Sequence, residues 1–397
     1  RALRHLAMNA DNKVELANLG AMPALVNVLE DDTAGEDAHE AAAAALEAMT
    51  LECVDNQLAL LRVGAITPLV ALLGSEHEES QVHASGALLH AAAPLTELSR
   101  VSVVRPLVAL LDVRNASAQM KAAELLAILA ARSTAHRTTV ARASAIPSLV
   151  RLLGDGRNVK TTQVHSAAAL CELARAAENR ELVVSAGGVE PLVGMLTSAS
   201  VEAQSRACAA VFHLSPLTST QQRVVGAGGI LPLVKLLASG HLEAARGAAG
   251  TLWHVAAHAE NKVAIVKAGA IVPLVTLLAR TDSPEAQEAA AGVLAALAKE
   301  KGAAKRAICN TGGLAPLIEL LSAGTPTAQK HAACALWGIT LDVHFRDAVT
   351  RAGAVQPLMK LGAPSRSSLH PHSWRCPIPT DLPLVSLGDT RGRYTDS

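Results

Sequence analysis

Apolar and polar positions along the chain follow one arrangement many times over, and residues 259–278 show it clearly. This stretch, AENKVAIVKAGAIVPLVTLL, opens on polar residues, continues as an apolar run to Gly269, and resumes with Pro273 and more aliphatic residues. Glycine readily adopts the left-handed backbone that ends a helix. Proline is tolerated in the first turn of a helix, where its missing N–H costs no hydrogen bond. The stretch therefore predicts two short helices that meet at Gly269.

The same glycine-to-proline spacing marks most of the chain. Clear copies are GAITP (64–68), GGVEP (187–191), GGILP (228–232), GGLAP (312–316) and GAVQP (353–357), and weaker copies end at Pro23, Pro106 and Pro147. Successive marker prolines lie 38 to 45 residues apart, with a mean of about 42. Repeats of roughly 40–47 residues are typical of α-solenoids built from two or three helices each. The period therefore predicts a helical repeat protein.

A third and longer helix is expected to close each unit. After the second helix comes a polar break, RTDSPEAQ at 280–287, in which Ser283 and Pro284 suit an N-cap and a first helical turn. The residues that follow, EAQEAAAGVLAALAKE at 285–300, consist mainly of strong helix formers such as Ala, Leu and Glu. Each repeat thus predicts a short, a short and a long helix.

These sequences resemble the armadillo repeat. The family pattern of an Asn near the first helix, then GAIPxLVxLL, then a third helix ending ALWALxNLA, is similar to NKVAIVKAGAIVPLVTLL (261–278) and AACALWGIT (332–340). The resemblance extends from residue 1 to about residue 363. It implies an all-α fold, a right-handed superhelical α-solenoid of armadillo repeats, whose third helices line a concave groove.

The repeat divides the chain into four parts. We expect residues 1–10 to be the third-helix remnant of a truncated repeat, residues 11–341 to form eight armadillo repeats, and residues 342–363 to start a further one. Residues 364–397 are rich in Pro and Ser, a composition typical of a disordered or peripheral tail. The third unit departs most from the pattern, because residues 96–108 lack the glycine, and a distorted or shortened first helix is expected there. Neither end shows a polar capping repeat, so we expect the native array to continue upstream of Arg1.

Composition narrows the class of protein. Half of the residues are apolar but only 2% are aromatic, so the core must consist of Ala, Leu and Val. Lys and Arg together equal Asp and Glu at 35 each, which gives no reason to expect nucleic acid as a partner. The six cysteines show no paired spacing and are expected to be reduced, which favours an intracellular protein, most simply cytoplasmic, with the nucleus as the alternative. No transmembrane segment is expected, and we expect a monomer.

Motifs for catalysis or cofactor binding were not found. GAGGIL at 226–231 ends on Leu231 and so fails the dinucleotide-binding fingerprint, and neither GxxxxGK[ST] nor GxSxG occurs. His254 and His258 have the spacing of two metal ligands on one helix, but no obvious third ligand accompanies them, so no metal or cofactor is expected. The chain is expected not to be an enzyme.

Histidines recur at two equivalent positions of the third helices. The first set is His5, His90, His213 and His254, and the second is His83, His165 and His331. An ordinary histidine pKa near 6.5 makes a pH-sensitive ladder one interpretation. Inheritance within duplicated repeats is the other.

Alignment of the third helices gives one position that the family resemblance directs into the groove. Its occupants are Arg4, Glu47, Leu89, Leu126, Cys171, Phe212, Trp253, Ala295 and Trp337. Three of the six aromatic residues of the chain share it, and the residues one turn earlier in those C-terminal helices are small, namely Ala209, Gly250, Gly292 and Cys334. Large flat side chains above an open floor suit an extended peptide, although packing between neighbouring third helices is the alternative. We assign a partner-binding groove to Phe212, Trp253, Trp337, Arg246, Lys299 and Lys330.

The resemblance does not extend to the importin-α branch of the family. That branch pairs the groove tryptophan with an asparagine four residues later, which would clamp the backbone of a basic peptide. The matching residues here are Met8, Leu51, Ala93, Ala130, Arg175, Pro216, Ala257, Lys299 and Leu341. The long row of basic groove residues that β-catenin uses for acidic partners is also absent.

The sequence favours a non-catalytic scaffold that binds an extended peptide or a partner surface in its groove. The alternative is the substrate-recognition region of a larger enzyme, such as a plant U-box ubiquitin ligase, with its catalytic module upstream of Arg1. Attachment to a membrane through an upstream lipidated end, as in vacuolar armadillo scaffolds, is a third hypothesis that these residues leave open.

Overall fold

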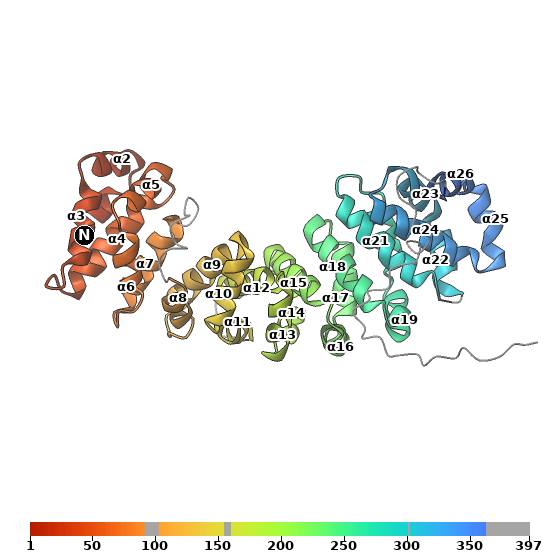
Figure 1. The fold of residues 1–397 in the computed structure, drawn as a ribbon, viewed down its shortest axis with the longest axis horizontal. Coiled ribbons are helices and arrows are strands. Elements are labelled where there is room, and N and C mark those ends of the chain that lie inside the picture. The colour runs from red at the N-terminus through yellow and green to blue at the C-terminus, as the bar shows by residue number, and fades with distance from the viewer. Residues whose placement is uncertain (92–102, 155–159, 301, 363–397) are drawn as a thin grey trace, which may run out of the picture. The chain divides into compact units, whose positions relative to one another are not determined.

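The computed structural model describes residues 1–91, 103–154, 160–300 and 302–362, and every regular element in them is a helix (Figure 1). The chain divides into two compact units, Arg1–Leu214 (unit 1) and Ser215–Ser397 (unit 2). Within each unit, a short first helix, a short second helix and a longer third helix follow one another, as the repeat predicts.

The helices have the following bounds. In unit 1 the first helices are α2 (Ala10–Asn18), α5 (Val54–Arg62), α10 (Thr134–Arg142) and α13 (Ala177–Ser185), and the second helices are α3 (Ala21–Glu30), α6 (Ile66–Leu72), α8 (Val104–Leu110), α11 (Ala145–Gly154) and α14 (Val189–Met195). The long helices of unit 1 are α4 (Glu36–Thr50), α7 (Glu78–Ala91), α9 (Ala116–Arg132), α12 (Lys160–Ala174) and α15 (Val201–Leu214), and the short α1 (Ala2–Leu6) packs on α4. In unit 2 the first helices are α16 (Thr218–Gly226), α19 (Ala259–Lys267), α22 (Ala303–Asn310) and α25 (Val343–Arg351), the second are α17 (Ile230–Leu237), α20 (Ile271–Leu278), α23 (Leu314–Ala323) and α26 (Val355–Gly362), and the third are α18 (Leu242–Val255), α21 (Pro284–Leu297) and α24 (Pro326–Thr340).

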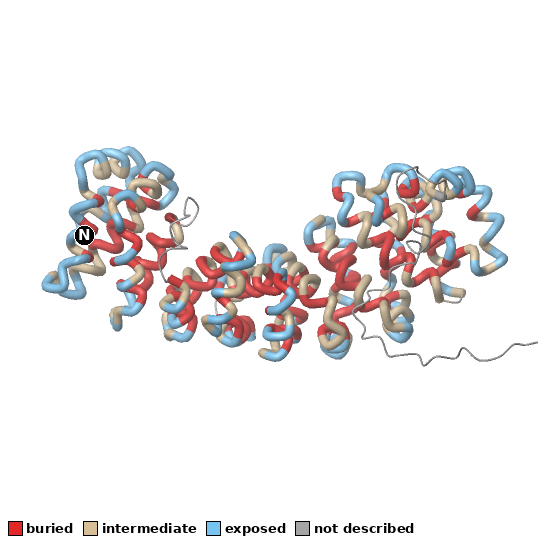
Figure 2. The backbone as a smooth tube through the Cα atoms, in the orientation of Figure 1, coloured by how far each residue is buried: buried red, intermediate tan, exposed pale blue. Residues whose placement is uncertain are grey.

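The third helices form a row in each unit. In unit 1, α4 contacts α7, α7 contacts α9, α9 contacts α12 and α12 contacts α15, and in unit 2, α21 contacts both α18 and α24. Each third helix also packs on the second helix of its own repeat, as α20 does on α21. Buried residues concentrate where these helices meet, and exposed residues lie on the turns (Figure 2). The core is made of Ala, Leu, Val and Ile, as the composition requires.

Gly269 ends a helix in the way that its position predicts. Its φ is +82°, its N–H bonds to the carbonyl of Val266 at 3.0 Å, and the N–H of Ala270 bonds to the carbonyl of Ile265 at 3.3 Å. This pattern is that of a Schellman turn, which satisfies carbonyls left open at a helix end. α20 begins two residues later with Pro273 in its first turn, so the predicted stop and restart is confirmed.

The polar break before a third helix has the predicted cap. Ser283 lies at the N-cap of α21, where its hydroxyl accepts a hydrogen bond from the N–H of Ala286 at 3.2 Å, and Pro284 is the first helical residue. The amide of Gln287 donates to the carbonyl of Leu278 at 2.7 Å, which ties the start of α21 to the end of α20. The cap and this bond fix the angle at which the third helix leaves the second.

Asparagine in the first helix has a structural role that recurs along the chain. Asn261 donates from Nδ2 to the carbonyl of Val255 at 3.0 Å, and Asn179 donates in the same way to Leu173 at 3.1 Å. Both acceptors belong to the last turn of the preceding third helix, where carbonyls have no partner within the helix. The asparagine of the repeat pattern therefore closes the junction between one repeat and the next.

Some predictions concern segments outside this description. Residues 96–102 of the third unit and the whole tail 364–397 lie outside the described residues. Among the described helices, none is by itself both long and apolar enough to span a bilayer, although α19 and α20 meet the length and composition criteria together across an 87° bend.

Close helix packing gives a first testable prediction, at Gly338 on α24. A Cβ at this position would lie 2.9 Å from the carbonyl oxygen of Ala298 at the end of α21, so the backbones would have to move apart. We expect Gly338→Ala to lower the free energy of unfolding by about 1–3 kcal/mol, despite alanine's higher helix propensity. Gly194→Ala is the matched control, because a Cβ on this exposed residue of α14 meets nothing within 4 Å. Urea denaturation should show the control unchanged or slightly stabilised, and equal behaviour of the two variants would contradict the packing argument.

Candidate partner-binding face

Five of the six predicted groove residues lie on one row of helices in unit 2. Trp253 and Arg246 belong to α18, Lys299 lies two residues after the end of α21, and Lys330 and Trp337 belong to α24. We call the side of α18, α21 and α24 that carries these residues the third-helix face. Phe212 lies on α15 at the end of unit 1, so its grouping with the others stays a prediction.

Trp253 lies across the neighbouring third helix. A Cβ on Gly292 of α21 would be only 3.1 Å from Cδ1 and Nε1 of the indole, so the ring rests on the backbone of that helix. The indole also reaches His331 on α24, with ring centroids 5.0 Å apart and planes tilted by 60°. The floor expected to be open at Gly292 is therefore filled by Trp253 itself, as in the packing alternative. Trp253 is half-buried and keeps part of its surface accessible, and a role in binding stays a prediction.

Trp337 is more exposed than Trp253. Its side chain is 55% exposed, which makes it the one tryptophan among the large exposed apolar residues of the described chain. No third helix follows α24 within the described residues, so nothing described there takes the place that α21 has beneath Trp253. Trp337 thus presents a large apolar surface to solvent.

The charged residues of the third-helix face are of both signs. Arg246 forms an ion pair with Glu243 one turn earlier, at 2.9 Å. Glu288 of α21 accepts a hydrogen bond from the hydroxyl of Thr325, the N-cap residue of α24, at 3.1 Å. Lys299 and Lys330 are half-buried. The face therefore combines aromatic surface with scattered charges, as the sequence predicts, and lacks a field of one sign.

The position that Trp253 occupies in unit 2 holds Glu47 in unit 1, and its side chain crosses the next helix in the same way. A Cβ on Gly86 of α7 would overlap the Glu47 carboxylate, which lies over that glycine. One carboxylate oxygen is 2.6 Å from Nδ1 of His83 on α7, and the other is 2.5 Å from Nζ of Lys121 on α9. Burial acts to raise the pKa of Glu47, but the hydrogen bonds from His83 and Lys121 outweigh it and hold this pKa below its usual value. A buried ionic group thus links three consecutive third helices.

Three members of the predicted groove column are buried, namely Leu126 of α9, Cys171 of α12 and Ala295 of α21. For Leu126 the alignment is off by one residue, because the next residue, Ala127, reaches the surface. Ala127 lies 21 residues after Pro106, which equals the distance from Pro232 to Trp253. The proline marker gives the correct register for this helix.

A family model described as armadillo/beta-catenin-like repeat matches residues 53–93, 176–215, 220–257, 258–299 and 303–341, which together are half of the chain. The chain belongs to the armadillo-repeat family. No curated protein sequence matches it significantly.

Solved structures of engineered and designed proteins are similar to this chain over long stretches. An engineered protein from the Northeast Structural Genomics Consortium is 31% identical with a TM-score of 0.76, covering 92% of this chain and 91% of the engineered one. A designed armadillo repeat protein is 27% identical with a TM-score of 0.53, covering 59% of this chain and 99% of its own. Another designed armadillo repeat protein, solved in complex with the peptide (KR)4, is 26% identical with a TM-score of 0.51 over 59% of this chain and 99% of its own. The all-α armadillo solenoid predicted from the sequence is confirmed.

The recurring histidines make contacts between armadillo repeats. In the first set, Nδ1 of His90 lies 3.2 Å from the hydroxyl of Thr50, and Nδ1 of His254 lies 2.9 Å from that of Ser215. Both hydroxyls occupy the same place near the end of the preceding third helix. Burial lowers the pKa of His90 below its ordinary value. These imidazoles join neighbouring repeats, which accounts for their recurrence.

The second set of histidines faces the preceding third helix. His331 is 1% exposed, with Nδ1 3.2 Å from the carbonyl of Glu288, and its Nε2 has no hydrogen-bond partner within the described structure. His165 has Nε2 3.8 Å from a carboxylate oxygen of Glu124. Burial lowers the pKa of His331, and nearby Lys330 acts in the same direction, while Glu288 acts in the opposite one.

A pH prediction follows from His331. Because its pKa is lower in the folded than in the unfolded chain, the unfolded chain binds more protons as the pH falls below about 6.5. The contribution of the neutral imidazole to stability is therefore complete above that pH and decreases below it, by at most about 1.4 kcal/mol per pH unit. We expect the difference in free energy of unfolding between the native chain and His331→Gln to shrink from pH 7.5 to pH 5. A difference that is independent of pH would contradict this.

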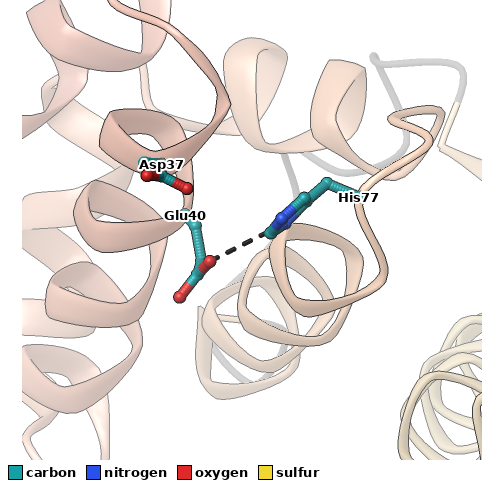
Figure 3. A group of neighbouring side chains, drawn as sticks. All are labelled: Asp37, Glu40 and His77. Carbon is teal, nitrogen blue, oxygen red and sulfur yellow. Dashed lines mark ion pairs between the residues drawn. The ribbon is translucent and has the colours of Figure 1, made fainter.

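Two histidine groups bear on metal binding. His254 bonds to Ser215 as described, and Nε2 of His258 lies 3.2 Å from the amide oxygen of Gln221, so each of the two has its own polar neighbour. Sequence reasoning missed a different group, Asp37, Glu40 and His77 (Figure 3), whose ligand atoms all lie within 4.8 Å of one another. The signal was the DxxE pair, Asp37 and Glu40, near the start of α4.

Nothing beyond proximity supports an ion at that group. His77 faces Glu40 at 3.7 Å, and all three side chains are exposed or half-buried. A carboxylate in the first turn stabilises a helix N-terminus by itself, which explains Asp37, and Glu40 lies one turn further along α4. We assign no ion to this group.

Proposed function

We propose that this armadillo protein is a non-catalytic interaction scaffold that holds an extended peptide, or an extended segment of a partner protein, on the third-helix face of unit 2. The observation that carries the proposal is the pair of tryptophans on one row of packed helices, with Trp253 half-buried and Trp337 55% exposed. Aromatic side chains dominate the energetics of interfaces. The similarity to a designed armadillo protein solved with a bound peptide supports the same use of the fold.

The spacing of packed helices sets the distance between the anchor residues of such a peptide. Adjacent packed helices lie about 8–10 Å apart, so two intervals separate α18 from α24 by about 16–20 Å. An extended peptide covers about 3.3 Å per residue, so anchors that reach both tryptophans would be about five or six residues apart. The energetic core of the interaction would then be short, and the rest of the peptide would add little.

The charges and polar groups of the third-helix face limit the kind of peptide that would bind. The positions four residues after the aligned groove position in α18, α21 and α24 are Ala257, Lys299 and Leu341, none of which could clamp a peptide backbone as asparagine does. Charges of both signs on the face disfavour a ligand of one strong charge. We propose apolar or aromatic anchors on the peptide.

A peptide selection tests this function. A phage-displayed library of random 16-residue peptides is panned on the full chain, and hydrogen exchange is then measured with the enriched peptides bound. We expect enriched sequences with apolar anchors about five or six residues apart, and protection confined to α18, α21 and α24. Failure to enrich any sequence, or protection on other helices only, would overturn the proposal.

A further inference from the structure

The last second helix of the described chain lacks the cover that the others have. None of the residues 355–361 of α26 is buried. On α20, by contrast, Leu274 and Leu277 are 0% and 4% exposed, and this helix contacts α21, α22 and α23. Leu358 and Leu361 occupy the matching places on α26 and are only half-buried.

Two further side chains show that the uncovered surface is the normal contact between repeats. Val275, two residues after Pro273, packs against Gly313 of the next repeat, where a Cβ would lie 3.0 Å from Cγ2 of the valine. Met359 stands two residues after Pro357, at the same position, and is 66% exposed.

We call Trp337, Leu341, Leu358, Met359 and Leu361 the end surface. In the inner repeats a third helix packs both on the previous third helix and on its own second helix, as α21 does on α18 and α20. The equivalent place after α26 lies against α24 and α26. Trp337 belongs to α24, Leu341 is the C-cap residue of α24, and the other three residues belong to α26. Leu341 adds a side chain that is 51% exposed. The end surface is therefore an apolar surface at a position where the inner repeats have a packed helix.

The same chain supplies an apolar segment within reach. Residues 374–387, WRCPIPTDLPLVSL, carry one tryptophan and five aliphatic side chains, and the segment begins 12 residues after Gly362. Twelve extended residues reach about 40 Å, several times the spacing of packed helices. A tethered segment also acts at an effective concentration in the millimolar range, which a second copy of the chain does not reach in ordinary solutions.

We propose that residues 374–387 of this chain bind the end surface, in the place that a third helix fills in the inner repeats. Pro377, Pro379 and Pro383 are incompatible with a helix interior, so the segment binds as an extended chain whose aliphatic residues cover Leu358, Met359 and Leu361. In this arrangement the segment supports Trp337 from beneath, as α21 supports Trp253. The contact is intramolecular and does not depend on a groove ligand.

Hydrogen exchange of the full chain tests the contact. Leu382→Asp combined with Leu384→Asp places two charges within the segment, and Ser367→Asp combined with Ser368→Asp adds the same charge outside it. We expect the amides of α26 to exchange at least tenfold faster in the leucine variant than in the native chain, with Met359 also oxidising faster. The serine variant should match the native chain, and native exchange should not depend on protein concentration.

Two outcomes would overturn the proposal. If all three chains exchange alike at α26, residues 374–387 do not cover the end surface. If native protection is present but decreases on dilution, with a dimer seen by light scattering, a second copy covers it instead.

Discussion

Replacing Glu47 by alanine is expected to lower the free energy of unfolding by about 2–4 kcal/mol. The substitution leaves the ammonium of Lys121 and the imidazole of His83 without their shared carboxylate, in side chains that are only 14% and 9% exposed. Removing one partner of a buried ionic group lowers the stability by more than the intact group contributes, because the remaining charge stays desolvated. Urea denaturation followed by circular dichroism, with hydrogen exchange of α4, α7 and α9, measures the loss and locates it.

A second substitution separates the charge effect from general damage. Lys121→Met in the Glu47→Ala background removes the stranded ammonium, so we expect the double variant to be more stable than the sum of the two single losses predicts. Glu202→Ala is the control, since its partner Arg206 lies 3.7 Å away and both side chains are more than half exposed. Its loss should stay below about 0.5 kcal/mol. If Glu47→Ala costs no more than this control, the group is not a structural link.

The helix junctions could be predicted from sequence because their causes are local. Gly269, Pro273 and Ser283 act through backbone conformation, a missing N–H and a single cap, and each effect spans only a few residues. The same is true of Asn261, although its partner, the carbonyl of Val255, is evident only once the two helices are placed. Repetition of such local signals was enough to give the fold.

The contacts across the third helices could not be predicted in the same way. Alignment of the repeats placed Trp253 and Glu47 at the same position. It did not show that each side chain crosses the neighbouring third helix and contacts the third helix after that. The sequence did contain a signal, which is a glycine on the neighbouring helix. Gly292 lies under Trp253 and Gly86 lies under Glu47, and each glycine stands three residues before the aligned position of its own helix. This signal can be interpreted only when the distance between neighbouring third helices is known, and the sequence of a single repeat does not give that distance.

The two tryptophans of the third-helix face are expected to respond differently to alanine substitution. Trp337→Ala should weaken the selected peptides by about 30-fold or more, the loss typical of an aromatic hot spot, with little change in stability, because its side chain is mostly exposed. Trp253→Ala should weaken binding and also lower the free energy of unfolding by about 2–3 kcal/mol, since the indole packs on Gly292 and His331. Fluorescence anisotropy with a labelled selected peptide and urea denaturation measure the two effects.

The double variant and a matched control complete the test. With both tryptophans replaced, peptide capture should be lost while the far-ultraviolet circular dichroism at 25 °C stays close to native, because the helices have their own caps and cores. Val272→Ala removes an equally exposed apolar side chain, 60% exposed but on α20, and should leave binding unchanged. If the double variant binds the selected peptides as tightly as the native chain, the third-helix face is not the binding site. If Trp253→Ala lost stability but bound normally, the side chain would be a packing element alone, and Trp337 with the residues around it would have to carry the interaction.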